Sequence, residues 1–150
     1  WNSGVIMVSF RNINAQESGP VEEWGFEGIL IAIDRGGLPQ WRRIIRAVQV
    51  DPYGKVASEV EEALEVAEDS GAAFIIEGAL KQARLDEKER FGQKFKALLA
   101  EAEMSQKEAA EFLGTSRPRV SSYCTGAVTP SALTFEKLRQ KVESRRRQLV

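Results

Sequence analysis

The segment SQKEAAEFLGTSRPRVSSYCTG, residues 105–126, decides the fold of this chain. Two short helices that cross at a steep angle need a small residue where they approach most closely and a permissive residue at the corner between them. Ala110 and Gly114 supply these two residues. Ser105 and Glu108 form a capping-box pattern at the start of the first helix, and Gly114 ends it because glycine tolerates positive φ. The segment therefore predicts two short helices joined by a tight turn.

The second of these helices is expected to begin at Ser116 and to end before Gly126. Apolar residues at helical spacing place one face of each helix in a shared core, and they are Ala109, Leu113, Val120 and Tyr123. The outward positions of the second helix, where a helix can enter the major groove of DNA, are Arg117, Pro118, Arg119, Ser121, Ser122 and Thr125. Pro118 disfavours helical dihedral angles at Arg117, which leaves open whether that side chain reaches a base or a phosphate.

The segment resembles the Cro/C1-type (Xre-like) helix-turn-helix of phage repressors, bacterial regulators and antitoxins. The resemblance covers residues 88–143, because apolar residues also recur where this family has its first helix and its last. The upstream set is Phe91, Phe95, Leu98, Leu99 and Ala102, and the downstream stretch is Thr129 and Pro130 followed by SALTFEKLRQKV. The resemblance implies an all-α, lambda-repressor-like domain of five helices. The helical pattern of the rest of the chain predicts that this domain follows a smaller helical N-terminal domain through a long helix.

The same resemblance implies that the partner is double-stranded operator DNA. Gln106 would contact a phosphate or buttress the second helix, and Arg side chains facing base edges would donate two hydrogen bonds to a guanine, worth about 1 to 3 kcal/mol per good pair. Hydroxyls such as Thr125 and Thr129 would hold phosphates and fix the register. The complete expected DNA-binding set is Gln106, Ser116, Arg117, Pro118, Arg119, Ser121, Ser122, Thr125, Thr129 and Ser131.

Pro118 and Phe112 depart from the pattern that the family usually carries. Phe112 lies where a polar, exposed residue is more common, so it either docks against another domain or protomer or is an isolated surface aromatic. Cys124 is the only cysteine and cannot form an internal disulfide. Its spacing places it near the hydrophobic side of the second helix, which favours a buried structural thiol over a redox sensor.

The composition argues against catalysis. The chain contains no histidine, which excludes His-based acid–base catalysis and His-containing zinc sites. The many carboxylates follow helix faces, as in a solvated acidic surface. Gly36 and Gly37 lack the lysine and hydroxyl residue that would follow in a phosphate-binding loop. We therefore expect no enzymatic activity, no cofactor and no metal ion.

Charge divides the chain into two halves. Residues 1–80 carry 6 Lys and Arg against 13 Asp and Glu, a net charge of −7, whereas residues 81–150 carry 15 against 9, a net charge of +6. This asymmetry predicts an acidic helical domain over residues 1–80 and a basic helix-turn-helix domain over residues 81–150. Arg145, Arg146 and Arg147 follow the last predicted helix as a basic tail. They would contact phosphates, cap that helix or form a disordered tail.

Apolar periodicity predicts three helices in the first half, spanning residues 21–33, 39–50 and 55–68, after an extended or irregular segment over residues 1–19. From Ala72 the helical pattern continues to about Ala102, either as one long helix or as two helices broken near residues 86–89. Phe74, Ile75 and Leu80 are expected to pack on the N-terminal helices.

These observations predict a cytoplasmic transcriptional repressor. The longest apolar runs are too short to span a membrane, and no basic region precedes the apolar run that contains Met7. The second half would bind an operator at its own or a nearby promoter, while residues 1–80 would form a homodimer or bind an effector or a protein partner. The alternative is an antitoxin that neutralises a toxin through residues 1–80. A third possibility is an interaction module that kept the fold and lost DNA binding.

Overall fold

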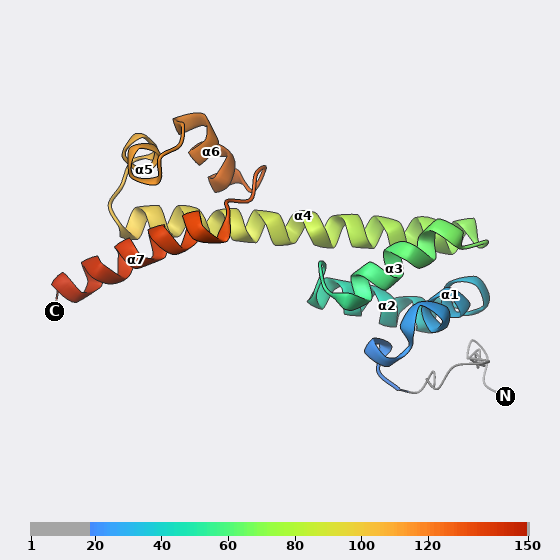
Figure 1. Cartoon of the computed structure of the whole chain (residues 1–150). Helices are drawn as coiled ribbons and strands as arrows, with labels where there is room; N and C mark the ends of the chain where they lie inside the picture. The colour runs from blue at the N-terminus through green and yellow to red at the C-terminus, as the bar shows by residue number, and fades with distance from the viewer. Residues whose placement is uncertain (1–18, 150) are drawn as a thin grey trace. The chain divides into compact units, whose positions relative to one another are not determined.

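The structure, a computed structural model, describes residues 19–149, and every regular element in that range is a helix (Figure 1). The predicted all-α class is confirmed. The expected extended segment lies outside the described residues, apart from Gly19. The elements are the 3-10 helix η1 (Val21–Glu23) and the helices α1 (Gly25–Arg35), α2 (Leu38–Val50), α3 (Lys55–Val66), α4 (Ser70–Glu101), α5 (Gln106–Leu113), α6 (Arg117–Thr125) and α7 (Ala132–Gln148).

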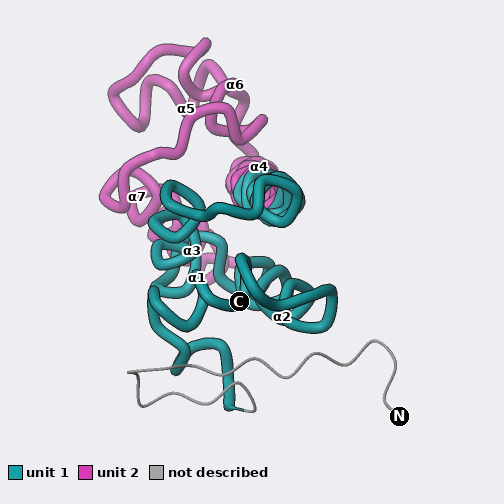
Figure 2. The backbone as a smooth tube through the Cα atoms, turned by 90° about the vertical axis from the view of Figure 1, so that its right-hand side faces the viewer, with its two compact units in different colours: residues 1–84 teal, residues 85–150 magenta. Residues whose placement is uncertain are grey.

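The chain divides into two compact units, unit 1 over residues 1–84 and unit 2 over residues 85–150 (Figure 2). The division lies within α4, which runs without a break and so realises the first of the two alternatives for this stretch. No helix in the described range combines the length and the apolar character that a membrane span requires.

In unit 1 the first predicted helix is split in two. η1 ends at Glu23, and α1 begins at Gly25, whose φ of 70° lies in the left-handed region that a continuous helix excludes. Trp24 between them is 1% exposed, and its indole Nε1 donates a hydrogen bond to the carbonyl oxygen of Gly19 at 3.3 Å. The break therefore directs the Trp24 side chain into the core.

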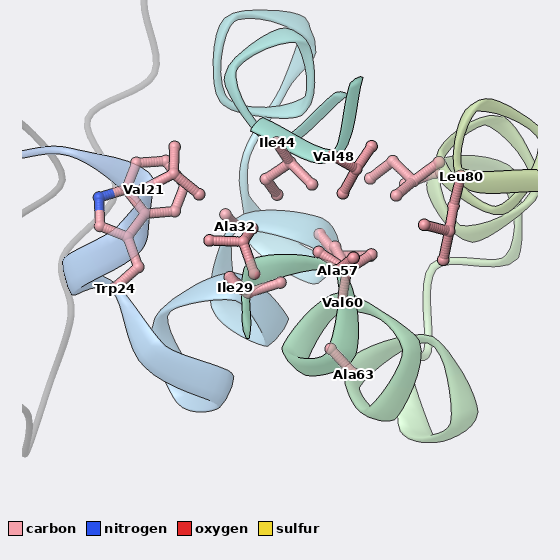
Figure 3. Packing of buried hydrophobic residues seen from close by; sticks show 14 residues of the cluster. Val21, Trp24, Ile29, Ala32, Ile44, Val48, Ala57, Val60, Ala63 and Leu80 are labelled. Atoms are coloured by element: carbon pink, nitrogen blue, oxygen red, sulfur yellow. The ribbon is translucent and has the colours of Figure 1, made fainter. Parts of the chain in front are cut away.

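Aliphatic side chains from four helices fill the rest of the unit 1 core (Figure 3). Alanines alternate with larger residues, which lets the helices approach closely. The buried members are Ile29, Ala32 and Ile33 of α1, Ile44 and Val48 of α2, Val56, Ala57, Val60 and Ala63 of α3, and Ala72, Ile76 and Leu80 of α4.

The expected packing of Phe74 and Ile75 is wrong, whereas that of Leu80 is confirmed. The side chains of Phe74 and Ile75 are 78% and 48% exposed. Ala72, Ile76 and Leu80 are the buried residues, and a spacing of four places them on one face of α4. Three consecutive apolar residues at 74–76 fit more than one helical face, and the structure selects the face that contains Ile76.

Unit 2 consists of the second half of α4 together with α5, α6 and α7. Its described residues therefore form four helical segments and not the five that the resemblance implied, because residues 126–131 join α6 directly to the 17-residue helix α7. The core of unit 2 is formed by Phe95 and Leu99 of α4, Ala102 directly after it, Ala109 and Ala110 of α5, Val120 and Tyr123 of α6, and Leu138 and Val142 of α7.

Candidate nucleic-acid interface

The turn between α5 and α6 has the geometry that the sequence predicts. The Ser105 hydroxyl accepts a hydrogen bond from the backbone N–H of Glu108 at 3.1 Å, and the Glu108 carboxylate accepts one from the Ser105 N–H at 3.2 Å. Gly114 ends α5 with φ 68° and ψ 37°, a left-handed conformation. The N–H of Thr115 then donates to the carbonyl oxygen of Ala110 at 2.9 Å. The capping box and the corner glycine are therefore confirmed.

The start of α6 is also fixed by a serine. The Ser116 hydroxyl accepts a hydrogen bond from the backbone N–H of Arg119 at 3.3 Å. Pro118 is the second residue of the helix, where a missing N–H leaves no intrahelical bond unmade. The expected departure of Arg117 from the helix is not found, because α6 includes Arg117 as its first residue. Both arginines therefore project from the first turn of one regular helix.

The inner face of α6 is anchored in the unit 2 core. Val120 is fully buried and Tyr123 is 5% exposed. The Tyr123 ring meets the Phe95 ring of α4 edge to face, with 5.4 Å between ring centroids. Such pairs add about 0.5 to 1.5 kcal/mol to the free energy of simple burial. Because one face of α6 is fixed in this way, the opposite face must point to solvent.

A close backbone contact holds the end of α6 against α4. A Cβ atom on Gly92 would lie 2.6 Å from the backbone nitrogen of Gly126 and 2.7 Å from the carbonyl oxygen of Cys124. A Cβ atom on Gly126 would lie 2.5 Å from the carbonyl oxygen of Lys88. Both positions therefore require glycine. Sequence reasoning overlooked Gly92, although a glycine three residues before Phe95, in a helix that it weakens, is a signal of close packing.

The expected DNA-binding residues lie at the surface of unit 2. Seven of them are exposed, namely Ser116, Arg117, Pro118, Arg119, Thr125, Thr129 and Ser131. Gln106, Ser121 and Ser122 are half-buried. The six residues between Arg117 and Thr125 come from α6 itself, so the structure brings them onto one helix. Their individual roles toward DNA stay predictions.

Several hydroxyls of this set are already used within the protein. Ser122 Oγ donates to the carbonyl oxygen of Pro118 at 3.1 Å, and Thr125 Oγ1 donates to that of Ser122 at 3.2 Å. Ser131 Oγ accepts from the backbone N–H of Thr134 at 3.1 Å and so caps α7. A hydroxyl has a single proton to donate. The guanidinium groups of Arg117 and Arg119 are therefore the strongest donors left on this face.

Arg119 is held by the same tyrosine that anchors α6. Its Nε donates a hydrogen bond to the Tyr123 hydroxyl at 3.0 Å, and its guanidinium carbon lies 5.9 Å from the centre of the Tyr123 ring. The two residues are one helical turn apart on the same side of α6, so the contact joins an exposed arginine to a buried tyrosine.

Phe112 is engaged inside unit 2. Its half-buried ring has the Nζ atoms of Lys137 and Lys141 at 4.9 and 5.8 Å from its centre, both from α7. Lys137 Nζ also donates to the carbonyl oxygen of Phe112 at 2.7 Å. Ammonium groups over an aromatic face are attracted by the ring quadrupole. The ring therefore helps to join α5 to α7, a role that neither sequence interpretation foresaw.

Cys124 is half-buried against the unit 2 core. Burial raises the pKa of its thiol above the ordinary value, with the positive charge of Lys96 acting weakly in the opposite direction. The thiol is therefore protonated at neutral pH, which is the condition of a structural cysteine and not of a reactive one.

The arginine cluster is not a tail. α7 continues to Gln148, so Arg145, Arg146 and Arg147 form its last turn. Arg145 pairs with Glu103 at 2.5 Å, and Arg146 Nε donates to Glu101 at 2.5 Å, which lowers the pKa of the Glu101 carboxyl. Figures 1 and 2 both show this end of α7 far from α6. Two of the three arginines thus tie α7 to the end of α4.

Comparison with known proteins agrees with this geometry. No curated protein and no solved structure matches the chain at a significant level. A protein-family model described as helix-turn-helix matches residues 95–141, a segment that contains the end of α4, the whole of α5 and α6, and the first part of α7. The match confirms the Cro/C1-type helix-turn-helix that the sequence predicts, over residues 95–141.

Proposed function

We propose that this protein is a sequence-specific transcriptional repressor that acts on its own or a nearby promoter. The observation that carries the proposal is the outer face of α6, where Arg117 and Arg119 project from the first turn of a helix whose ends and inner face are fixed. α6 lies inside the segment that matches the helix-turn-helix family. A rigid helix with guanidinium groups on either side of its outer face suits a guanine-containing half-site.

In the proposed mechanism α6 enters the major groove and occupancy of the promoter blocks transcription. Arg119 donates to a guanine, and Arg117 donates to a neighbouring base or phosphate. Gln106, Thr129 and Ser131 are proposed to hold phosphates on either side, because backbone contacts fix the register without reading sequence. Each neutralised phosphate should steepen the salt dependence of binding, with a logarithmic slope of about 0.9 per phosphate.

We further propose that the repressor acts in the cytoplasm as a homodimer. A pair of such helices binds half-sites about 34 Å apart, one turn of DNA. Residues 1–80, with a net charge of −7, repel the phosphate backbone and are therefore suited to protein contacts and not to DNA.

The test is fluorescence anisotropy of the whole chain on DNA from upstream of its own gene, with scrambled DNA of the same composition as the control, across a salt series. Binding that prefers the upstream DNA and weakens with salt supports a specific repressor. Equal binding to both DNAs, or none at physiological salt, would overturn the proposal.

A second candidate, an antitoxin, is favoured by the surface of unit 1. Phe74 and Ile75 are exposed on α4 within an otherwise acidic unit, and an exposed apolar pair of this kind is suited to burial by a protein partner. The candidate requires a neighbouring gene whose product arrests growth alone and not together with this chain. A Phe74→Ser variant should then lose neutralisation and keep DNA binding, and an innocuous neighbour would exclude the antitoxin.

A further inference from the structure

We infer that Tyr123 is a positioning residue that presents Arg119 to a guanine base in a fixed orientation. The inference rests on the proposed DNA-binding function and adds a specificity determinant to it. Tyr123 itself lies on the inner face of α6 and is 5% exposed, so it acts through the arginine and not by reading DNA directly.

The position of the Tyr123 hydroxyl is set by the core. Edge-to-face contact with Phe95 at 5.4 Å restrains the ring, and Phe95 is itself fully buried in α4. A tyrosine has two side-chain torsions, and with the ring held its oxygen has one position. The hydroxyl therefore acts as a rigid acceptor that the core places at the rim of the outer face.

The hydrogen bond at this acceptor orients the whole guanidinium group of Arg119. Nε donates to the Tyr123 oxygen at 3.0 Å, and the guanidinium is planar, so fixing Nε restricts the plane and the direction of the terminal Nη atoms. The contact to guanine O6 and N7 needs two parallel N–H groups, which Nη1 and Nη2 supply when Nε is engaged elsewhere. Arg119 is thus arranged for a bidentate contact before DNA arrives.

Arg117 provides the contrast within the same turn. Among the described residues no hydrogen bond or ion pair holds its exposed side chain. Its side chain must therefore lose its rotamer freedom on binding, whereas that of Arg119 has already lost part of it. Of the two arginines, Arg119 is the one that the structure prepares to read a base.

The variant Tyr123→Phe tests this role because it keeps the ring and removes only the hydroxyl. We expect affinity for the best site to fall about 2- to 10-fold, the range expected when one side chain must be ordered anew on binding. Discrimination at the base pair that Arg119 contacts should fall with it. The salt slope should stay unchanged, because no charge is lost. The thermal midpoint should change little, because the ring stays packed and only one hydrogen bond, to an exposed arginine, is removed.

The experiment starts from a pool of duplex DNA with about 20 randomised base pairs, enough for two half-sites. Wild-type protein selects its best sequence from the pool, and that duplex and its single-base variants are then the probes for Tyr123→Phe, Arg119→Ala, Arg119→Lys and the double variant Tyr123→Phe/Arg119→Ala. Tyr53→Phe is the matched control, because Tyr53 also lies under an arginine, Arg84 of unit 1, at 5.2 Å.

Coupling between the two positions decides the outcome. The inference predicts that Tyr123→Phe relaxes the same base position as Arg119→Ala and has no further effect in the Arg119→Ala background. Arg119→Lys, which leaves Tyr123 in place, should lose the discrimination and keep the salt slope. Unchanged discrimination in Tyr123→Phe, or equal losses in both backgrounds, would overturn the positioning role. Failure of the wild type to select any sequence would instead overturn the proposed function.

Discussion

Serine hydroxyls at the N-cap position cap all three helices that follow α4 in unit 2, whereas the N-cap residues of α1, α2 and α3 in unit 1 make no side-chain hydrogen bond to their helices. Ser105, Ser116 and Ser131 each accept a hydrogen bond from a backbone N–H three residues later. In unit 1, α2 and α3 follow Gly37 and Gly54, which have no side chain to cap with. At α2 the third residue reaches back instead, because Gln40 Oε1 accepts a hydrogen bond from the Gly37 N–H at 2.8 Å.

The difference follows from what each unit must hold in place. α5 and α6 have 8 and 9 residues, too few to be stable as isolated helices. Their ends are therefore defined locally, and this definition fixes which residues of α6 face outward. Unit 1 relies on contacts distant in sequence, such as the Asp34 carboxylate that accepts from the N–H groups of Glu68 and Asp69 at 2.9 and 3.0 Å. The short, capped helices of unit 2 therefore present a well-defined surface. The helices of unit 1 are held mainly by the aliphatic core that they share.

The largest effect is expected at the contact between α6 and α4. Gly126→Ala would place a Cβ atom 2.5 Å from the Lys88 carbonyl oxygen at a φ of 82°, so overpacking and backbone strain together should lower the free energy of unfolding by about 2 to 4 kcal/mol. Chemical denaturation measures it. Gly114→Ala is the control, because its φ is also positive but its Cβ meets open space, and it should lose about half as much. Equal losses would mean that the close contact is not limiting.

Arg119→Ala is expected to have the next largest effect, on DNA binding. Loss of a bidentate base contact should weaken specific binding by about 1 to 3 kcal/mol and relax preference at one base pair. Anisotropy on the selected duplex and its single-base variants measures both. Arg84→Ala in unit 1, where the arginine pairs with Glu61 at 2.7 Å, should leave both unchanged. If Arg119→Ala bound the selected duplex as wild type does, Arg119 would not be a base-reading residue.

The serine caps can be tested directly. Ser105→Ala should lower stability by about 1 kcal/mol, because the N–H of Glu108 loses its acceptor. Hydrogen exchange should speed up in the first turn of α5. Ser58→Ala, at an exposed position inside α3, should change stability little, since that serine caps no helix. Similar losses at Ser105 and Ser58 would remove the distinction between the two units.

A substitution at Gly78 in unit 1 is expected to raise the stability of the protein instead of lowering it. Gly78 lies inside α4, and a Cβ atom there meets nothing within 4 Å. Gly78→Ala should therefore stabilise the protein by about 0.5 to 1 kcal/mol through higher helix propensity. A thermal melt measures it, and destabilisation would show that another surface covers this face of α4.

Sequence reasoning succeeded where structure is determined locally. Ser105, Gly114 and Ser116 act on residues within four positions, so the ends of α5 and α6 could be predicted from the sequence. The outward positions of α6 then followed from helical spacing, and their exposure could be anticipated.

It failed where the outcome depends on residues distant in sequence. Phe74 and Ile75 are as apolar as Ile76, so only packing against the rest of unit 1 decides which of them is buried. The need for a glycine at position 92 follows only from the close approach of Gly126, which is distant in the sequence. The arginines at the end of α7 stay helical partly because Glu101 and Glu103 pair with two of them. The bond between Arg119 and Tyr123 depends on side-chain torsions that spacing does not determine.

The smallest effect on stability is expected from the two carboxyls when the pH is lowered. Hydrogen bonds from Arg146 and Arg139 lower the pKa values of the Glu101 and Glu136 carboxyls in the folded state. A carboxyl with a lowered folded pKa contributes stability above its unfolded pKa, about 4.3, and loses that contribution as the pH falls through the folded pKa. Both carboxyls are exposed, so the loss should be small. Glu101→Gln should reduce stability slightly at pH 7 and flatten its decline below about pH 4, as followed by denaturation across a pH series. A decline identical to that of wild type would show that the Glu101–Arg146 pair does not form in solution, and that the last turn of α7 is held without it.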